Sequence, residues 1–258
     1  MASDDLSQLT AIIPTRGYSK PLHRLQRSLK RTYPRLKVLV ADEGVDSPAS
    51  GDGRSIRLPV GAGRAAACNA MLARLRTPYF LLLDEQCEIG KETRLEQLLE
   101  FIMLDNLDVA SGDFIGCQKK FWFFLRQMPQ PGHGILELAG DQLTVLAGHR
   151  SAGEGFYWCD MVHNFFVART DKVRAIGGWD PELKNDEREE FFVRAHRHGL
   201  RVGIVPEVTA RYWNEKRTVQ SAEPQPNLKS LAVAKMGLAR MTELDGHVVK
   251  APRRARAA

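Results

Sequence analysis

Asp84 and Glu85 stand where a buried strand of this chain is expected to end. Residues 79–83, Tyr-Phe-Leu-Leu-Leu, are strongly apolar and have the length of a strand inside a sheet. Carboxylates at the carboxyl end of such a strand can hold a divalent cation against a diphosphate. Acidic turns are also common at solvated strand ends, so the pair by itself leaves both interpretations open.

A second pair of carboxylates, Glu187 and Glu190, falls in a helix predicted over residues 186–198. Their spacing of three residues puts them on one helical face, and Phe191 and Phe192 supply apolar surroundings. A carboxylate held against an apolar wall has a raised pKa, which suits a general base. The alternative is a capped first turn whose acids complement the helix dipole.

The elements that would position these acids alternate along the chain. Apolar periodicity predicts strands at residues 9–14, 36–40, 55–58, 79–83, 107–111, 164–168 and 200–205. Helices are predicted from residue 21, from the glycines at 61–63 to about residue 76, and at residues 92–104, 170–176, 186–198 and 228–241. Alternation of this kind predicts a single α/β domain with a mostly parallel sheet flanked by helices.

Polar clusters follow three of the predicted strands. They are Pro14-Thr15-Arg16, Asp42-Glu43 and Asp84-Glu85-Gln86. Ligands of open α/β sheets bind beyond the carboxyl ends of the strands. We therefore expect the three clusters to share one cleft.

Residues 113–154 lose the periodicity amid Gly, Pro and aromatic residues. Such a stretch is either a long functional excursion from the scaffold or a divergent hairpin insertion. The expected organisation is an N-terminal extension at 1–8, one domain at 9–241 with halves at 9–112 and 113–241, and a disordered basic tail at 242–258.

The charge of the chain is concentrated at its end. With 37 basic and 31 acidic side chains, the net charge is +6 and the pI about 9.2. Four of these charges, on Lys250, Arg253, Arg254 and Arg256, lie in the last nine residues. The balanced remainder argues against nucleic acid as a partner. The tail is suited to loose contact with an anionic membrane.

Nothing in the sequence predicts export. The first five residues include two acids where a signal peptide is basic and then apolar, and no apolar run reaches the roughly 18–20 residues of a membrane span. The four cysteines form no CxxC pair, which is typical of reduced thiols. We expect a cytoplasmic protein with peripheral contact at the inner face of the membrane.

The collinear order of these segments resembles the GT-A glycosyltransferases, which use nucleotide-sugar donors on a Rossmann-like sheet. The resemblance is closest to the β-1,4-N-acetylgalactosaminyltransferases that build gangliosides and related glycans, and to their bacterial relatives. It covers residues 10–213 and is carried by residues 11–16, 40–43, 77–85, 93–96, 107–109, 160–174, 177–181 and 190–192. Each segment is modest alone, and their shared order assigns the superfamily.

The resemblance implies transfer of GalNAc or another hexose from a UDP-sugar to a hydroxyl of a glycan or lipid-linked acceptor, with inversion. The half at 9–112 would bind the nucleotide, and the half at 113–241 would supply the acceptor and catalytic groups. The matching donor-binding positions are Pro14, Thr15, Arg16, Asp42, Arg64, Asn69, Asp84 and Glu85.

Further positions follow from the same resemblance. Asp160 and Asn164 match residues that border the donor sugar or the acceptor, and Trp158 is a candidate for the acceptor wall. The catalytic base is expected at Glu187 first and Glu190 second. The first choice directly precedes Arg188, a place where related inverting enzymes often carry an acid.

Two departures from the family pattern concern a metal site. The resemblance implies Mn²⁺ or Mg²⁺ held by Asp84, but Gln86 and Tyr212 stand where two further ligands are expected. An amide and a phenol are poor ligands for these cations, which puts metal dependence in question. Cations of the protein can also stabilise a departing UDP dianion. We therefore hypothesise that Arg211, Lys216 or Arg217 replaces the metal.

Two other functional classes compete with an active transferase. A GT-A domain that has lost catalysis and serves as a binding or scaffold module would show the same degenerate metal motif. A nucleotidyltransferase also uses a nucleotide-binding α/β sheet, but it needs a phosphate-gripping glycine loop and intact metal carboxylates. Thr15-Arg16-Gly17-Tyr18 is a poor match to such a loop.

Overall fold

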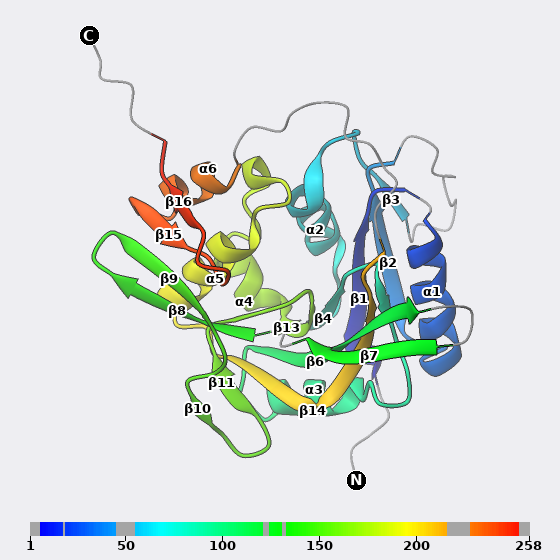
Figure 1. Cartoon of the computed structure of the whole chain (residues 1–258). Helices are drawn as coiled ribbons and strands as arrows, with labels where there is room; N and C mark the ends of the chain where they lie inside the picture. The colour runs from blue at the N-terminus through cyan, green and yellow to red at the C-terminus, as the bar shows by residue number, and fades with distance from the viewer. Residues whose placement is uncertain are drawn as a thin grey trace.

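The computed structural model describes residues 6–17, 19–44, 55–120, 124–130, 133–215 and 228–252. Within them, an 11-stranded central sheet is covered by helices on both faces (Figure 1). A 5-stranded sheet lies beside the end of the central sheet that contains β11 and β14. The central strands are β1 (Leu9–Thr15), β2 (Lys37–Asp42), β3 (Ser55–Arg57), β4 (Tyr79–Leu83), β5 (Cys87–Glu88), β6 (Val109–Lys120), β7 (Phe124–Gln130), β10 (Ser151–Ala152), β11 (Tyr157–Cys159), β13 (Phe165–Arg169) and β14 (Val202–Trp213).

The helices interleave with these strands as predicted. They are α1 (Lys20–Thr32), α2 (Gly63–Arg74), α3 (Leu95–Met103), α4 (Thr170–Ala175), α5 (Arg188–Arg197) and α6 (Leu228–Lys235), with short 3₁₀ turns at Leu6–Gln8 and Pro181–Leu183. None of the helices in the described residues is long and apolar enough to cross a membrane.

The central sheet has the order β10-β11-β14-β6-β13-β4-β1-β2-β3. Strands β3, β2, β1 and β4 are mutually parallel, whereas β13 runs antiparallel to both β4 and β6. The expectation of a mostly parallel sheet therefore holds for β3, β2, β1 and β4 and for the parallel pair of β6 and β14. The exceptions are β13 and the short or peripheral strands β5, β7, β10 and β11, which pair antiparallel. The chain enters β13 beside the carboxyl end of β4, with Phe165 opposite Leu83, so it must run in the reverse direction.

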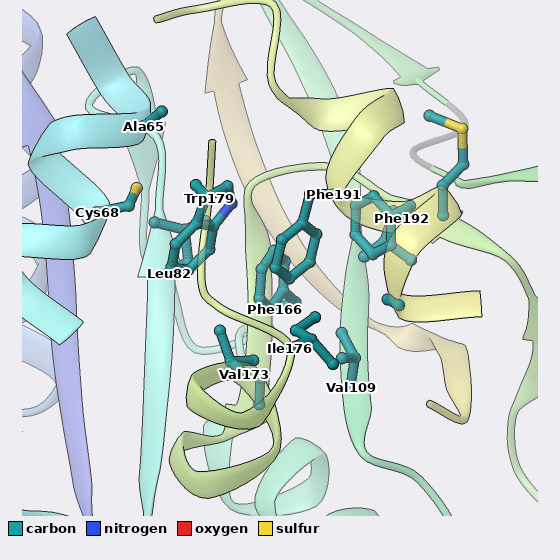
Figure 2. Close-up of a cluster of buried hydrophobic side chains, with 14 of the residues drawn as sticks. Ala65, Cys68, Leu82, Val109, Phe166, Val173, Ile176, Trp179, Phe191 and Phe192 are labelled. Carbon is teal, nitrogen blue, oxygen red and sulfur yellow. The ribbon is translucent and has the colours of Figure 1, made fainter. Parts of the chain in front are cut away.

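Side-chain alternation divides the apolar residues of the sheet between two cores. On β4, Phe80 and Leu82 face the core under α2, α4 and α5, while Leu81 and Leu83 face the core under α1 and α3. Figure 2 shows the first core, where Trp179 stacks on Phe191 with 4.9 Å between ring centroids. This packing fixes the start of α5 against the sheet.

Residues 113–154 are mainly hairpins, which decides between the two interpretations of this stretch. Strand β6 pairs with β7 in the central sheet. The smaller sheet has the order β12-β8-β9-β15-β16, formed by β8 (His133–Ala139), β9 (Gln142–Ala147), β12 (Met161–Val162), β15 (Arg240–Thr242) and β16 (Val248–Lys250).

The expected disorder from residue 242 onwards is wrong for residues 242–250. Strand β15 adds to β9 in parallel and pairs with β16, which buries Met241 and Val249. The predicted helix 228–241 is also shorter, because Gly237 turns the chain with φ +73° soon after α6 ends. Residues 253–258, and with them Arg253, Arg254 and Arg256, lie outside the described residues.

Burial predicts unequal costs for one substitution at two leucines. Leu82 on β4 is 1% exposed, whereas Leu104 after α3 is 64% exposed. We expect Leu82→Ala to lower the free energy of unfolding by about 2–5 kcal/mol, because it leaves a cavity in the core. Leu104→Ala should change it by less than about 0.5 kcal/mol. Urea unfolding of both variants measures the difference, and equal losses would contradict the assigned core.

Candidate active site

A pocket lies at the carboxyl ends of β1, β2 and β4, where the three polar clusters were expected to meet. It brings together six of the predicted donor-binding residues. The lining residues are Pro14, Thr15, Arg16, Glu43, Arg64, Ala67, Asp84, Glu85 and Asn185. The pocket thus combines two arginines with several carboxylates, and the sheet topology predicted its place correctly.

Carboxylates inside this pocket hold the strand-end loops together. Glu43 is 6% exposed, contacts Arg16 Nε at 3.0 Å and accepts a hydrogen bond from the backbone N–H of Gly63 at 2.7 Å. Thr15 donates its hydroxyl hydrogen to Glu85 Oε2, with 2.5 Å between the oxygens. Glu85 thereby binds the end of β1, and Glu43 binds the first residue of α2, the helix that follows β3.

The first turn of α2 has its N–H groups occupied by the protein. Besides Gly63 on Glu43, the N–H of Arg64 donates to Asn185 Oδ1 at 3.2 Å and the N–H of Ala65 donates to the carbonyl of Lys184 at 2.8 Å. A helix N-terminus with free N–H groups would bind an anion. Here these donors already have partners, so an anion in the pocket must be held chiefly by side chains.

Gly63 allows this close approach. Its φ is +87°, and a Cβ added there would lie 2.6 Å from Lys184 Cα. Only glycine meets both requirements without displacing the backbone. Gly63 therefore serves to place α2 against residue 184 in this structure.

Asp42 is a buried acid with an unused oxygen. Its Oδ1 accepts a hydrogen bond from the N–H of Gly44 at 2.7 Å, whereas Oδ2 has no hydrogen-bond partner within the described residues. Burial raises the pKa of this carboxyl, and N–H groups of Gly44 and Gly17 partly offset the effect. Oδ2 therefore has the capacity to accept one further hydrogen bond, although Asp42 does not itself line the pocket.

Glu187 is 2% exposed and lies directly before α5. Its Oε1 is 3.3 Å from Arg64 Nε, and its Oε2 has no hydrogen-bond partner in the part of the chain described. Burial raises the pKa of Glu187, and the charge of Arg64 offsets only part of this effect. A desolvated carboxylate with one free oxygen is equipped to accept a proton.

Glu190 occupies a different environment. Both of its oxygens accept hydrogen bonds from Arg194, each at 2.8 Å. Arg194 also donates to the backbone carbonyls of Ile176 and Gly178. Glu190 therefore holds the arginine that ties α5 to the turn before Trp179. The two acids share a sequence pattern, but the tertiary contacts give Glu190 a structural role.

The expected metal ligands do not form a ligand set in this structure. Asp84 Oδ1 accepts the N–H of Gln86, and the side-chain oxygen of Gln86 accepts the N–H of Glu215 at 2.8 Å. Tyr212 packs on Phe114 with 4.8 Å between ring centroids. Across the described residues, no group of three or more His, Cys, Asp or Glu side chains is placed to hold a metal ion. The residues present therefore do not fit a bound Mn²⁺ or Mg²⁺.

Arg211 is placed differently from the hypothesis that it replaces a metal. Its guanidinium lies 3.3 Å from Glu92 and 3.9 Å from Glu88, and it does not belong to the lining of the pocket. Strand β14 pairs with β5 here, so Arg211 lies opposite Glu88 in the ladder. Lys216 and Arg217 lie outside the described residues. The arginines that do line the pocket are Arg16 and Arg64.

The structure separates Trp158 and Asp160 from this pocket. Trp158 pairs with Gly203 at the amino end of β14, whereas the pocket lies at the carboxyl ends of strands that run in the same direction. The Trp158 ring packs on Phe156. Asp160 accepts hydrogen bonds from Arg150 and from the N–H of Leu136, each at 2.8 Å. Trp158 thus packs within the central sheet, Asp160 joins β8 of the smaller sheet through Leu136, and neither residue lines the pocket.

Asn164 and Asn69 also have defined places. The backbone carbonyl of Asn164 accepts the N–H of Asp84 at 2.8 Å, which puts Asn164 beside the pocket. The Asn69 amide instead makes two hydrogen bonds with the backbone of Trp179, at 2.6 and 2.9 Å. Asn69 therefore joins α2 to the turn before α5, and the expectation of a donor contact receives no support.

Glu43 and Asn185 line the pocket, although neither was predicted from the sequence to bind the donor and only Glu43 was expected at the cleft. Glu43 was visible as the second acid of the β2 cluster, but its hydrogen bond to Gly63 depends on folding. Asn185 lies two residues before Glu187 and carries no signal of its own. Both supply the contacts that place α2.

Comparisons with known proteins agree with this architecture. The sequence pattern described as glycosyl transferase family 2 matches residues 10–162. Beta-1,4 N-acetylgalactosaminyltransferase 1 of Homo sapiens is 33% identical over 193 residues, covering 72% of this chain and 35% of that protein. The type 2 enzyme of Mus musculus is 28% identical over 189 residues, covering 70% of this chain and 35% of that protein. The chain thus spans about a third of the length of these relatives.

Solved structures show the same fold. GalNAc-T7 with UDP, GalNAc and Mn²⁺ superposes with a TM-score of 0.66 at 15% identity, covering 89% of this chain and 48% of that one. Residues 1–349 of S. aureus TarS in complex with UDP-GlcNAc give a TM-score of 0.61 at 18% identity, covering 88% and 66%. These proteins share the architecture of a mixed sheet between helices.

Different environments predict different stability effects at Glu187 and Glu190. The raised pKa of Glu187 means that folding favours its protonated form, so its charge costs stability as pH rises through that pKa. Glu187→Gln should therefore leave the free energy of unfolding at pH 7 unchanged or higher. Glu190→Gln should lower it by about 2 kcal/mol, because Arg194 loses a charged partner. Urea unfolding at pH 7 compares them, and an equal loss at Glu187 would contradict this assignment.

Proposed function

The chain belongs to glycosyltransferase family 2, and on that premise we propose that it transfers a sugar from a UDP-sugar to an acceptor hydroxyl. The observation that carries the proposal is the pocket at the ends of β1, β2 and β4, which gathers six residues expected on the donor. Its fold is that of the GT-A transferases. The resemblance to this superfamily and the α/β class are thereby confirmed.

Arg16 and Arg64 are the groups proposed to face the donor diphosphate. Both line the pocket, and the N–H groups at the start of α2 are engaged elsewhere, so guanidinium groups are the available counter-charges. Guanidinium groups form strong, often bidentate hydrogen bonds with phosphate oxygens. The unused Oδ2 of Asp42 is proposed to accept the N–H of the nucleobase edge, with Pro14 and Thr15 along the nucleoside.

Glu187 is the proposed catalytic base of an inverting reaction. The acceptor oxygen forms a bond to the anomeric carbon while the bond from that carbon to the diphosphate oxygen breaks. The bonding electrons leave with UDP, and the hydroxyl proton passes to Glu187 Oε2. Burial and the free Oε2 support this choice, and the double hydrogen bond of Glu190 to Arg194 argues against the second candidate.

We assign no step to a divalent cation. Mn²⁺ accompanies the related GalNAc-T7, but the ligand set of this chain does not fit such an ion in the described residues. The diphosphate charge would be neutralised by Arg16 and Arg64. Arg211 is not proposed for this role, because it does not line the pocket.

The finer assignments rest on the relatives. GalNAc is proposed as donor sugar from the β-1,4-N-acetylgalactosaminyltransferases, and a glycan or lipid-linked glycan as acceptor. Asn164 is proposed near the sugar because its carbonyl binds Asp84. A cytoplasmic setting at the inner face of a membrane is proposed from the four buried free cysteines and from the basic end of the chain.

A catalytically inactive binding module is the second candidate. The incomplete metal ligand set favours it, because degenerate motifs are expected where catalysis has been lost. Such a module would bind UDP-sugars without consuming them. Transfer or hydrolysis of a UDP-sugar therefore distinguishes the two functions.

Substitution of the proposed base should separate catalysis from binding. Glu187→Gln removes the proton acceptor but keeps its size, so we expect kcat to fall about 10²–10⁴-fold while the Kd for UDP changes less than about threefold. Glu189→Gln, a control two residues further along the same segment, should retain activity. Steady-state transfer assays and calorimetry measure both properties. Unchanged turnover in Glu187→Gln would remove Glu187 from this role.

Charge removal should show which arginine serves the donor. Arg16→Ala is expected to raise the Kd for UDP about tenfold, because a charge-assisted hydrogen bond is lost. Arg211→Ala should leave it unchanged, since Arg211 lies outside the lining of the pocket. Calorimetry with UDP, UDP-GalNAc and UDP-GlcNAc, each with EDTA or Mn²⁺, measures both variants. Binding that EDTA abolishes and Arg16→Ala does not change would show that a metal is required.

A further inference from the structure

The side chain of Arg64 lies between the proposed base and the proposed diphosphate site. Its Nε contacts Glu187 Oε1 at 3.3 Å, and the residue also lines the donor pocket beside Asp84. Burial opposes the charge on Arg64, but the carboxylates of Glu187 and Asp84 outweigh burial and raise the pKa of the guanidinium. The positive charge of Arg64 therefore interacts with both Glu187 and Asp84.

The backbone at Arg64 is held by hydrogen bonds, whereas its side chain lies between Glu187 and the pocket. Its N–H donates to Asn185, and the neighbouring Ala65 N–H donates to Lys184. The side chain of Arg64 is 25% exposed, whereas that of Glu187 is 2% exposed. The arginine side chain can therefore reach a ligand in the pocket, while the acid stays buried.

We propose that Arg64 is a positioning residue that is shared between Glu187 and the diphosphate of the donor. The inference rests on the proposed function. A bound diphosphate draws the guanidinium away from Oε1, so that Glu187 is left as a buried carboxylate without its cation. The base then gains proton affinity only when the donor is in place. Without donor, the ion pair keeps the carboxylate a weaker base.

The direction of the linked proton follows from the charges around Glu187. Burial raises the pKa of Glu187 and Arg64 lowers it, while Asp186 and Glu189 of its own segment raise it further. From α2, Cys68 also faces Glu187, and its thiol remains protonated because burial raises its pKa. Removing the influence of Arg64 raises the pKa of Glu187. Binding of UDP should thus be accompanied by proton uptake at Glu187, at pH values between the pKa of Glu187 in the free protein and its higher pKa in the complex.

Calorimetry of UDP binding tests the coupling without using activity. Titrations at several pH values between about 5 and 7, in buffers of different ionisation enthalpy, give the number of protons bound with UDP. We expect uptake of up to about one proton in the unmodified chain and loss of most of it in Glu187→Gln. Glu189→Gln, which lies on the same segment, should retain the uptake.

Arg64→Met adds a second measurement. It should raise the Kd for UDP about tenfold and abolish the Glu187-dependent proton uptake, because Glu187 lacks the cation in both states. The pH profile of kcat reports the donor-bound enzyme, and that of kcat/KM reports the free enzyme. In the unmodified chain, the acidic limb of the kcat profile should therefore lie at higher pH than that of the kcat/KM profile. In Arg64→Met the two acidic limbs should coincide. A merely structural role of Arg64 would not move these limbs relative to each other.

The outcomes separate this inference from the function on which it rests. UDP binding with no Glu187-dependent proton uptake, or coincident limbs in the unmodified chain, would overturn the sharing of Arg64 and leave the transferase standing. Absence of binding by any UDP compound would overturn both.

Discussion

The contact between the first turn of α2 and residues 184–187 positions both sides of the site. Gly63 lies against Lys184, and the N–H groups of this turn bind Glu43, Asn185 and the Lys184 carbonyl. The contact joins the β2 end to the segment before α5, over more than a hundred residues of sequence. It places Arg64 beside Glu187 and, at the same time, occupies the N–H groups of the helix. The anion-binding capacity of the pocket therefore moves from the backbone to Arg16 and Arg64.

Burial then gives two neighbouring acids different properties. Glu187 has a free oxygen and one cation at 3.3 Å, so desolvation dominates and its pKa rises. Glu190 is satisfied on both oxygens by Arg194, which itself binds backbone carbonyls of the preceding turn. Loss of one partner of such a pair leaves a charge poorly compensated. One acid is thus available for chemistry and the other holds the helix.

Much of the scaffold was predictable from local patterns. Strands β1, β2 and β4 begin and end within two residues of the predicted runs, because continuous apolar runs bounded by polar residues define them. The common cleft at their carboxyl ends also follows from parallel pairing. By contrast, residues 113–154 and 242–250 were misread or left open, since their strands gain stability only from partners far away in sequence, such as β9 with β15. Trp158 and Asp160 lie away from the pocket because their segment also pairs with partners that are distant in sequence.

The sequence by itself determined the fold class, the family and the residue types gathered at the strand ends, because these depend on periodicity and on collinear motifs. Only the tertiary structure decided which of these residues act together. It assigned Asn69 to Trp179, Arg211 to Glu88 and Glu92, and Arg64 to Glu187. Charge interactions depend on the distance between the groups and on their burial in the folded protein, and neither can be calculated from the spacing of residues along the chain.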